Sequence, residues 1–588
     1  MPSLIDHLSA LVGDAFEATG LSYDLGRVIR SDRPDLGQFQ CNGAMSAAKQ
    51  VNASPRQIAE KVRALLESHD AFSDVSIAGP GFINLTLTDG FLAAHAQALD
   101  QDERFSSDPH EQKTVILDFG GPNIAKPMHV GHLRSTIIGD CLQRLFKFAG
   151  DKTVSDIHMG DWGKPMGMLI SELKASEPDL PYFESDYEGA DPSTSPLSMT
   201  DLEGLYPKAA AACKKDEARD QAAREATAEL QSGKVGYRAL WRHFVNVSKE
   251  GLRWEFDALG VRFDLWKGES DVDDLIAPMV EDMETTGVVE HDQGASIIRV
   301  ALPDDQQEIP PLIVLKSDGA ATYGMTDLAT ILDRVRIYQP DLILYVVDQR
   351  QNGHFVQVFR AAEKAKIAND VEFEHVGFGT INGPDGKPFK TREGGVMKLH
   401  DLISMVCETA GERLEEAGLA ADYSPDEKKQ IANQVGIAAL KFADLGNHRL
   451  SDYVFDLDRF LRFEGKTGPY LQYAAVRINS ILRKSGLDRS AVAPVLIGIH
   501  SESERELILA LSVFSEAIEG AYERRAPNIL CDHVYSLAQA YSRFYAEHHI
   551  LSESDSAIRQ SRLLLCCMTL DQIELCLNLL GIEVPARM

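Results

Sequence analysis

Apolar and polar residues follow three different patterns along this chain, and each pattern predicts a different kind of region. Near the N-terminus, apolar residues at helical spacing in LIDHLSALVGDAF and SPRQIAEKVRALLES predict two helices, the second with Ser54 as N-cap and Pro55 at its first position. The next segment, VSIAGPGFINLTLT, alternates apolar and polar residues as a half-buried strand does. We therefore expect an α+β domain over residues 1–108.

From residue 109 to residue 424, short apolar runs alternate with helical patterns. The runs are TVILDF, TVSDIHMG, PPLIVLKSDG, LILYVVD and FEHVGFGTI. Such alternation predicts a parallel sheet with crossover helices, so we expect a Rossmann-like, doubly wound α/β domain. An acidic segment with proline and serine, followed by polar helical patterns, interrupts the alternation and predicts a helical insertion over about residues 172–262.

After residue 424 the patterns are helical. Long amphipathic segments such as EKKQIANQVGIAALKFADL and YLQYAAVRINSILRKSG continue to the last residues. They predict an all-α helical bundle over residues 425–588.

Composition narrows the class of protein. With 588 residues and 44% apolar content, the chain is expected to form several packed domains. It holds no apolar run of the roughly 20 residues that span a bilayer, and Asp6 and Asp14 interrupt any signal-peptide core, so we expect a cytoplasmic protein without membrane contact. The eight cysteines are scattered without a CxxC pair, which argues against zinc and disulfides. The net charge of −30 argues against a general nucleic-acid coat protein but not against a local basic track.

The candidate chemistry is concentrated in the turn GGPNIAKPMHVG. This turn follows a predicted strand at residues 115–119 and opens a helical pattern that ends near Gly150. In an open α/β sheet, ligands bind at the carboxyl ends of the strands, where a helix N-terminus attracts anions. The location suits a nucleotide phosphate. Because neither GxGxxG nor GxxxxGK[ST] occurs at this turn, flavin, nicotinamide and P-loop sites are not expected.

Two histidines lie at the start of this helix. His129 and His132 are three positions apart, so both can offer N–H donors to phosphate from one face, while Gly131 allows close approach and Lys126 adds a mobile positive charge. An HxxH pair is also compatible with a metal-binding pair or with solvated histidines. The loop supplies no third ligand of the usual kinds, so we expect no protein-bound metal.

The same stretch resembles a known signature. HVGH is similar to the HIGH motif of class I aminoacyl-tRNA synthetases, and PNIAKPMHVGHLRSTIIGD is similar to arginyl-tRNA synthetases in particular. The similarity continues in HMGDWGKPMGMLI, ATYGMTDLAT, VVDQRQNGHF and LNLLGIEVPARM, and so covers nearly the whole chain. It implies a monomeric ligase that activates L-arginine with ATP and Mg²⁺ and transfers it to tRNA(Arg), releasing AMP and pyrophosphate.

A second motif, GPDGKPFKTREGG, follows the predicted strand HVGFGTI. By itself it is compatible with a mobile basic surface loop, whereas in the resemblance it corresponds to a degenerate KMSKS loop. Positive charge on such a loop can stabilise the transition state of phosphoryl chemistry. The resemblance implies the catalytic residues Lys126, His129, His132, Lys390 and Arg392. It implies the ATP-binding residues Lys126, His129, Gly131, His132, Lys387 and Lys390.

An arginine substrate requires carboxylates, because a buried guanidinium must be paired. Asp118 and Asp327, at strand ends near the turn, are the candidates; without the motif, Asp327 is also compatible with an acid favoured by a helix dipole. The resemblance implies the arginine-binding residues Asp118, Asn123, His132, Tyr323, Asp327 and Gln351.

Contacts to tRNA are implied in both flanking regions. In the resemblance, Phe82 and Asn84 reach the tRNA elbow, although Phe82 is also compatible with a core position. Tyr470, Tyr473 and Arg477 share one helix face that suits unstacked anticodon bases or, alternatively, a core stripe, and Met588 matches a further contact.

Two other functions are compatible with parts of the sequence. A catalytically silent paralogue that only binds tRNA is expected to lose His129, His132 or the basic loop, and all are present. A small HIGH-bearing nucleotidyltransferase would lack the flanking regions.

Overall fold

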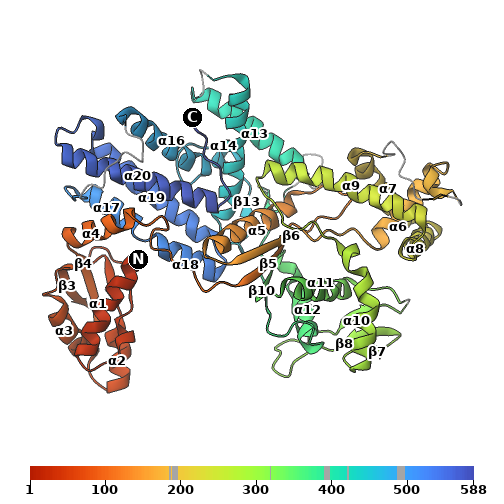
Figure 1. Ribbon diagram of the computed structural model, residues 1–588, viewed down its shortest axis with the longest axis horizontal. Helices are drawn as coiled ribbons and strands as arrows, with labels where there is room; N and C mark the ends of the chain where they lie inside the picture. Colours follow the sequence, from red (N-terminus) through yellow and green to blue (C-terminus); the bar gives the residue numbers. More distant parts are fainter. Residues whose placement is uncertain are drawn as a thin grey trace. The chain divides into compact units, whose positions relative to one another are not determined.

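The computed structural model describes residues 1–184, 187–188, 197–317, 319–383, 385–387, 389, 397–419, 423–486 and 497–588. The chain forms two compact units, one of Met1–Pro109 with Leu461–Met588 and the other of His110–Phe460 (Figure 1). None of the helices in the described ranges is long and apolar enough to cross a membrane.

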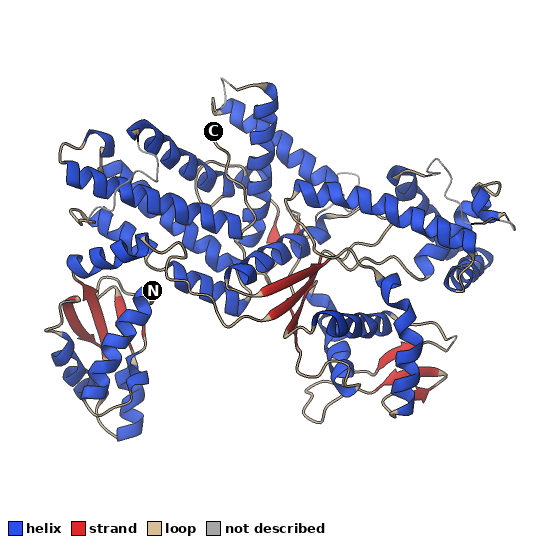
Figure 2. Cartoon of the chain, viewed as in Figure 1, coloured by secondary structure: helices blue, strands red, loops and turns tan. Residues whose placement is uncertain are grey.

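The N-terminal part of the first unit is a four-stranded antiparallel sheet with helices (Figure 2). Its strand order is β1-β2-β4-β3. Helix α1 buries Leu4, Leu8, Val12 and Phe16, which recur every fourth position as predicted for an amphipathic helix. The elements are α1 (Leu4–Ala18), η1 (Tyr23–Gly26), β1 (Val28–Arg30), β2 (Phe39–Cys41), α2 (Gly43–Val51), α3 (Pro55–Leu66), β3 (Phe72–Ala78), β4 (Phe82–Leu87) and α4 (Asp89–Asp100).

The segment VSIAGPGFINLTLT, predicted as one strand, forms parts of two. Strands β3 and β4 pair antiparallel, with Ala78 opposite Phe82. Gly79 and Gly81 in the turn have φ of +52° and +152°, a region of backbone conformation that favours glycine. The two glycines thus reverse a chain that the alternating pattern alone treats as continuous.

The C-terminal part of the first unit is helical. Helix α20 is buried on all sides from Ser561 to Leu570, which places it at the centre of this bundle. The segment ERELILALSVFSEAIEGAYE has the amphipathic pattern of one long helix, but it is divided near Ser512 and Val513 into α17 and α18. The elements are α16 (Gly468–Ser485), α17 (Glu502–Leu511), α18 (Phe514–Arg524), α19 (Pro527–Glu547), η6 (Ile550–Ser552) and α20 (Ser556–Leu579).

The second unit is organised around a four-stranded parallel sheet, which confirms the predicted α/β fold. The strand order is β11-β10-β5-β6, for β5 (Thr114–Phe119), β6 (Lys152–Asp156), β10 (Leu342–Val346) and β11 (Glu372–His375). Alternate residues of β5 face opposite layers: Ile116 joins a core with helices α11 and α12, and Phe119 lies so close to Gly139 of α5 that no side chain would fit there. Helices therefore cover both faces of the sheet, as in a doubly wound fold.

One predicted strand of this sheet lies elsewhere. The run LIVL forms β9 and pairs antiparallel with β8 in a separate three-stranded sheet of order β7-β8-β9. The expectation that PPLIVLKSDG belongs to the parallel sheet is wrong, because a short apolar run does not specify which strand it pairs with.

The remaining elements of the second unit are mainly helices. Helix α14 packs against α13 and α5 in this unit. The elements are α5 (Val130–Phe148), α6 (Lys164–Ser176), η2 (Pro181–Phe183), α7 (Met199–Lys215), α8 (Glu217–Gln231), α9 (Val235–Ala258), η3 (Glu269–Val272), α10 (Asp273–Thr285), β7 (Glu290–Asp292), β8 (Ala295–Ile298), β9 (Leu312–Leu315), α11 (Tyr323–Tyr338), η4 (Gln349–Gln351), α12 (Asn352–Lys364), β12 (Ile381–Asn382), α13 (Leu399–Glu416), α14 (Pro425–Leu445), β13 (Tyr453–Val454) and α15 (Leu457–Phe460).

Candidate active site

Helix α5 begins at the carboxyl end of β5, and a buried hydroxyl fixes it there. The Ser135 Oγ accepts the backbone N–H of Gly120 at 2.8 Å and donates to the carbonyl of Val346 at 2.6 Å. This side chain therefore ties the first turns of α5 to the ends of both β5 and β10. At its other end α5 is capped as predicted, with Gly150 at φ +103° after the C-cap Ala149.

The two histidines cap the N-terminus of α5 with the same ring atom. The Nδ1 of His129 accepts the backbone N–H of Gly131 at 3.0 Å, and the Nδ1 of His132 accepts that of His129 at 3.1 Å. Since each Nδ1 is an acceptor, a neutral ring carries its proton on Nε2. Both rings therefore present an Nε2–H donor at a helix N-terminus, where an anion is favoured.

The environment keeps both rings neutral. Burial, together with charge repulsion from His129 and Lys126, lowers the pKa of His132 to about 3. Burial also lowers the pKa of His129, and the nearby Lys126 acts in the same direction. At neutral pH the histidines are hydrogen-bond donors, and the positive charge in this turn belongs to Lys126.

The packing around residue 131 requires a glycine, in addition to the predicted close approach of a nucleotide. A Cβ at this position would lie 2.8 Å from Cε1 and 2.9 Å from Nδ1 of His129. Any side chain at residue 131 would therefore push against the ring that caps the helix.

The segment after the basic loop pairs with this turn. Val130 donates its N–H to the carbonyl of Met397 at 3.1 Å, and Leu399 donates to the carbonyl of Met128 at 2.9 Å, so that His129 and Lys398 form a β-bridge. Of the basic loop, Lys387 is exposed and its backbone forms a tight turn with Gly383. Lys390 and Arg392 lie outside the described residues.

Asp118 is buried at the end of β5 and is bound by an arginine of the chain itself. The Arg334 guanidinium donates to one carboxylate oxygen of Asp118 at 2.6 Å and to Asp156 at 2.8 Å. Asp118 shares the face of Ile116, which is the face covered by α11, the helix that carries Arg334. Burial raises the pKa of Asp118, and the Arg334 charge opposes this shift.

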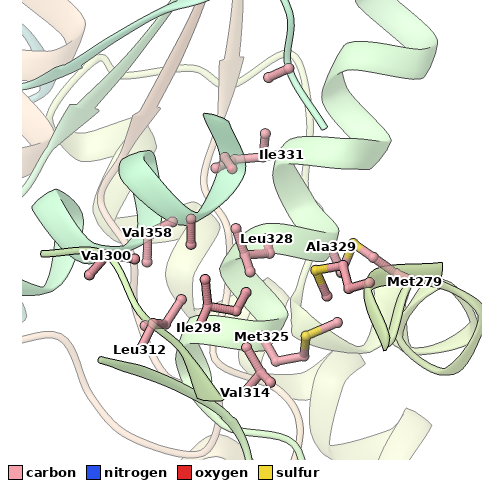
Figure 3. Close-up of a cluster of buried hydrophobic side chains, with 14 of the residues drawn as sticks. Met279, Ile298, Val300, Leu312, Val314, Met325, Leu328, Ala329, Ile331 and Val358 are labelled. Carbon is pink, nitrogen blue, oxygen red and sulfur yellow. The ribbon is translucent and has the colours of Figure 1, made fainter. Parts of the chain in front are cut away.

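Helix α11 presents two of the predicted arginine-binding residues. Its buried side, with Met325, Leu328, Ala329 and Ile331, packs in an apolar core (Figure 3). Tyr323, its first residue, is 68% exposed. The carboxylate of Asp327 lies 2.6 Å from His354 Nε2 and beyond the first turn of α11, so a hydrogen bond with α12 rather than a helix terminus holds it.

Asn123 and Gln351 complete the predicted set at neighbouring strand ends. Asn123 is exposed in the β5–α5 loop and forms a parallel bridge with Gly160, after β6. Gly160 is required there, because a Cβ would lie 2.4 Å from the side-chain oxygen of Asn123. Gln351 is exposed at the N-terminus of α12, after β10. The parallel sheet thus brings the predicted residues that follow β5 and β10 to one edge.

Five of the predicted tRNA contacts in the first unit belong to two elements, strand β4 and helix α16. Phe82 is half-buried at the start of β4, whereas Asn84 is only 3% exposed and its Nδ2 has no hydrogen-bond partner in the described part of the chain. On α16, Tyr470 bonds to Ser542 at 3.2 Å, and the Arg477 guanidinium lies 4.4 Å from the centre of the Tyr545 ring.

A hollow of about 510 Å³ opens beside Arg477. It is lined by Arg477, Ile481, Ser542, Tyr545, His548 and His549. Tyr473 and the terminal Met588 are half-buried in the same unit. Aromatic, imidazole and guanidinium groups around one hollow suit an unstacked base.

No metal centre is visible in the described ranges: they contain no group of three His, Cys, Asp or Glu side chains that could hold a metal ion.

Comparison with known proteins decides the family. A model described as tRNA synthetases class I (R), catalytic domain, matches residues 95–457. Models of the arginyl tRNA synthetase N terminal domain and of the DALR anticodon binding domain match residues 4–87 and 471–588. A protein of Maricaulis maris named arginine–tRNA ligase is 53% identical over the full length of both chains. The chain belongs to the arginyl-tRNA synthetase family.

Other members of the arginyl-tRNA synthetase family agree with this assignment. Proteins named arginine–tRNA ligase from Hyphomonas neptunium and Alkaliphilus oremlandii are 50% and 47% identical, each over the full length of both chains. Solved arginyl-tRNA synthetases share the fold: the enzyme of Plasmodium falciparum has a TM-score of 0.82 at 24% identity, and that of Thermus thermophilus 0.77 at 22%, with all of each chain covered.

Two residues of this family member were not predicted as part of the site. Burial, together with the carboxylates Asp161 and Asp327, raises the pKa of Glu269 to about 8. Glu269 in turn helps to raise the pKa of Tyr323, so it lies beside the predicted arginine-binding residues. Tyr206, from α7, contacts Lys126. The sequence offers no local signal for either, because both reach the site from elements distant in sequence.

Proposed function

We propose that this chain is an arginine–tRNA ligase, which joins L-arginine to the 3′ end of tRNA(Arg) and converts ATP to AMP and pyrophosphate. The observation that carries the proposal is the neutral histidine pair, with both Nδ1 atoms held by the backbone of α5. The carboxylates Asp327 and Glu269 are connected to the same turn through Tyr323, Tyr206 and Lys126. An anion site next to a cation site suits a nucleotide and an amino acid with a cationic side chain.

In the first step, a carboxylate oxygen of arginine attacks the α-phosphorus of ATP, and the bond to the pyrophosphate oxygen breaks. The protein supplies positions and charges rather than a nucleophile. His129 and His132 would donate their Nε2–H groups to phosphate oxygens. The ammonium group of Lys126 would offset part of the negative charge of the phosphates. Lys387, Lys390 and Arg392 would add positive charge as the transition state forms. Mg²⁺ would accompany ATP, held mostly by phosphates and water.

The arginine side chain would bind among carboxylates at the strand ends. Arg334 bonds to one oxygen of Asp118, which leaves the other for the substrate. Asp327 and Glu269 would add charge-assisted contacts, each worth roughly 1.5–3 kcal/mol, so that a neutral analogue is rejected. Asn123, His132, Tyr323 and Gln351 would orient the remaining polar groups.

In the second step, a ribose hydroxyl of the tRNA attacks the arginyl carbonyl carbon, the bond to AMP breaks, and the hydroxyl proton passes to the leaving phosphate or to water. Phe82 and Asn84 would contact the tRNA elbow. Tyr470, Tyr473, Arg477 and Met588 would contact the anticodon loop, with Arg477 at the hollow beside Tyr545. We expect a monomer that works in the cytosol.

Two assays of the purified chain test this function. We expect arginine-dependent exchange of pyrophosphate into ATP, stronger in the presence of tRNA, and attachment of labelled arginine to bulk tRNA. The double variant His129→Ala/His132→Ala should lose at least about 100-fold in kcat/KM but still bind tRNA. A wild-type chain that binds tRNA without exchange or charging would instead match a silent paralogue and contradict the proposal.

A further inference from the structure

Helix α7 reaches the first turn of α5 through two side chains. The ammonium group of Lys126 lies 4.1 Å from the centre of the Tyr206 ring. The Nζ of Lys398 lies 2.7 Å from a carboxylate oxygen of Glu203. Because residues 203 and 206 are three positions apart in one helix, they share a face. One face of α7 therefore contacts both lysines next to the histidine pair.

The two contacts differ in whether they offset the positive charge of the lysine. Glu203 offsets the charge of Lys398, so this ion pair anchors the backbone segment that pairs with residues 128–130. An aromatic ring instead attracts an ammonium group through its face, without accepting a proton or cancelling the charge. Lys126 thus keeps its positive charge and its hydrogen-bond donors while its long side chain is held in one place.

Tyr206 packs against a small hydrophobic core and lies near the residues predicted to bind arginine. It packs against the small core formed by Met168, Ala209 and Ala223. Its other neighbour is Tyr323, whose pKa is raised by burial, with Glu269 and Tyr206 as the charged or ionisable groups that add to the shift. Because this packing holds the Tyr206 ring in place, the ring can restrict the position of the Lys126 ammonium group.

We propose that Tyr206 is a positioning residue for Lys126, so that α7 completes the nucleotide site. The ring holds the ammonium group ready for the triphosphate. Without it, the lysine side chain would occupy many rotamers, and binding ATP would cost the entropy of ordering them. This inference rests on the proposed function.

The test compares three substitutions at residue 206 in a charging assay with ATP varied. We expect Tyr206→Leu and Tyr206→Met, which remove the aromatic face, to raise the KM for ATP about 5- to 30-fold. Tyr206→Phe retains the face and should stay within about 2-fold of wild type. Tyr206→Met keeps most of the apolar volume, so it provides the result if the leucine variant is unstable.

Repeating the Tyr206 substitution in a Lys126→Met variant distinguishes a role in positioning Lys126 from a general role in stabilising the fold. Because Tyr206 acts through Lys126, Tyr206→Leu should add less than about 2-fold when Lys126 is already replaced in Lys126→Met. The matched control is Lys234→Met. It removes another lysine–tyrosine contact of 4.1 Å, to Tyr237 in α9, and should leave the KM for ATP unchanged.

Three results would overturn the role of Tyr206. They are an unchanged KM for ATP in the folded leucine and methionine variants, an equal effect of Tyr206→Leu with and without Lys126, or a phenylalanine variant as impaired as the leucine variant. If the wild-type chain charges tRNA, these results contradict the role of Tyr206 alone. A wild-type chain that does not charge tRNA contradicts the proposed function itself.

Discussion

The Nδ1 of His132 accepts the backbone N–H of His129 at 3.1 Å. One nitrogen of each ring thus satisfies a free N–H at the start of α5, and the cap does not use the other nitrogen. The backbone of the helix selects the tautomer, and burial keeps the rings neutral. The HxxH spacing therefore caps the helix and leaves two Nε2–H donors for the proposed anion site.

Replacement of Gly131 by alanine tests this arrangement without removing either histidine. The new Cβ would lie 2.8 Å from the His129 ring and displace it. We expect kcat/KM for ATP to fall about 10- to 100-fold, since small misplacements of catalytic groups have effects of this size. The control is Gly90→Ala in α4, where no atom lies within 4 Å; it should leave activity unchanged. Wild-type activity in Gly131→Ala would contradict the capping role of His129.

The raised pKa of Glu269 predicts a pH dependence of arginine binding. With a pKa of about 8, Glu269 in the free protein is mostly protonated at pH 7, whereas a bound cation favours the carboxylate. The kcat/KM for arginine should therefore rise as the pH increases from 6.5 to 8.5.

In Glu269→Gln this rise should disappear, and kcat/KM should fall about 10-fold or more at pH 8.5 but less at pH 6.5. The measurement is a pH profile with arginine varied at saturating ATP. A variant that keeps the wild-type slope would show that another group titrates.

Arg334 is expected to be essential for the stability of the second unit. It is 1% exposed and pairs with both Asp118 and Asp156. Arg334→Met leaves two buried carboxylates without their cation and should lower the free energy of unfolding by roughly 3–5 kcal/mol. Adding Asp118→Asn should recover part of this loss, because it removes one of the unpaired charges.

Urea or thermal unfolding of the second unit measures both effects. Arg350→Met is the matched control, because its ion pair with Asp348 has the same 2.6 Å length but Arg350 is 79% exposed. It should leave the unfolding midpoint unchanged. Equal midpoints for the two methionine variants would argue against a buried network.

Arg505 joins the N-terminal sheet to the helical bundle within the first unit. From α17 it donates to the carbonyl of Leu87 at 2.6 Å and to the Gln38 side chain at 3.1 Å, and it pairs with Asp89. If the sheet and the bundle both bind tRNA, the contacts of Arg505 hold the two binding surfaces at a fixed separation. A tRNA bound to one surface then meets the other at a high effective concentration. Arg505→Met should raise the KM for tRNA about 5- to 20-fold and leave the KM for arginine unchanged.

Charging assays with tRNA and then arginine varied measure the two constants. Arg543→Met, which removes an exposed 2.9 Å pair with Glu506 in the same bundle, should change neither. A rise in the KM for arginine alone would contradict this role for Arg505.

Local features of the fold follow from the sequence, and long-range pairings do not. Pro55 and the terminal Gly150 mark helix ends because they act on the backbone beside them, and Ser54 takes the predicted N-cap position although its side chain makes no capping hydrogen bond. By contrast, β9 has the apolar pattern of a parallel strand but pairs antiparallel in another sheet. The apolar run does not say which of its faces will be buried: β10 is buried throughout, whereas Ile313 of β9 is 47% exposed.

The candidate site divides in the same way. The cluster of Asp118, Asn123, Gln351 and the histidine turn at one edge follows from the rule that parallel strands end together. The partner of Asp118 does not: Arg334 is 216 residues away and has no motif of its own. The contacts of Tyr206 and Glu269 likewise depend on how α7 and η3 pack, which no local period encodes.

By itself the sequence determined the family, the order of the α+β, α/β and helical regions, and the turn that carries the chemistry. These are encoded by residues near one another in the chain, where spacing sets dihedral angles and faces. The tertiary structure alone decided which charges meet: Arg334 with Asp118, Lys126 with Tyr206, and Glu269 with other carboxylates. Such pairings depend on packing between distant segments, and a charged residue has the same sequence signal whichever partner it finds.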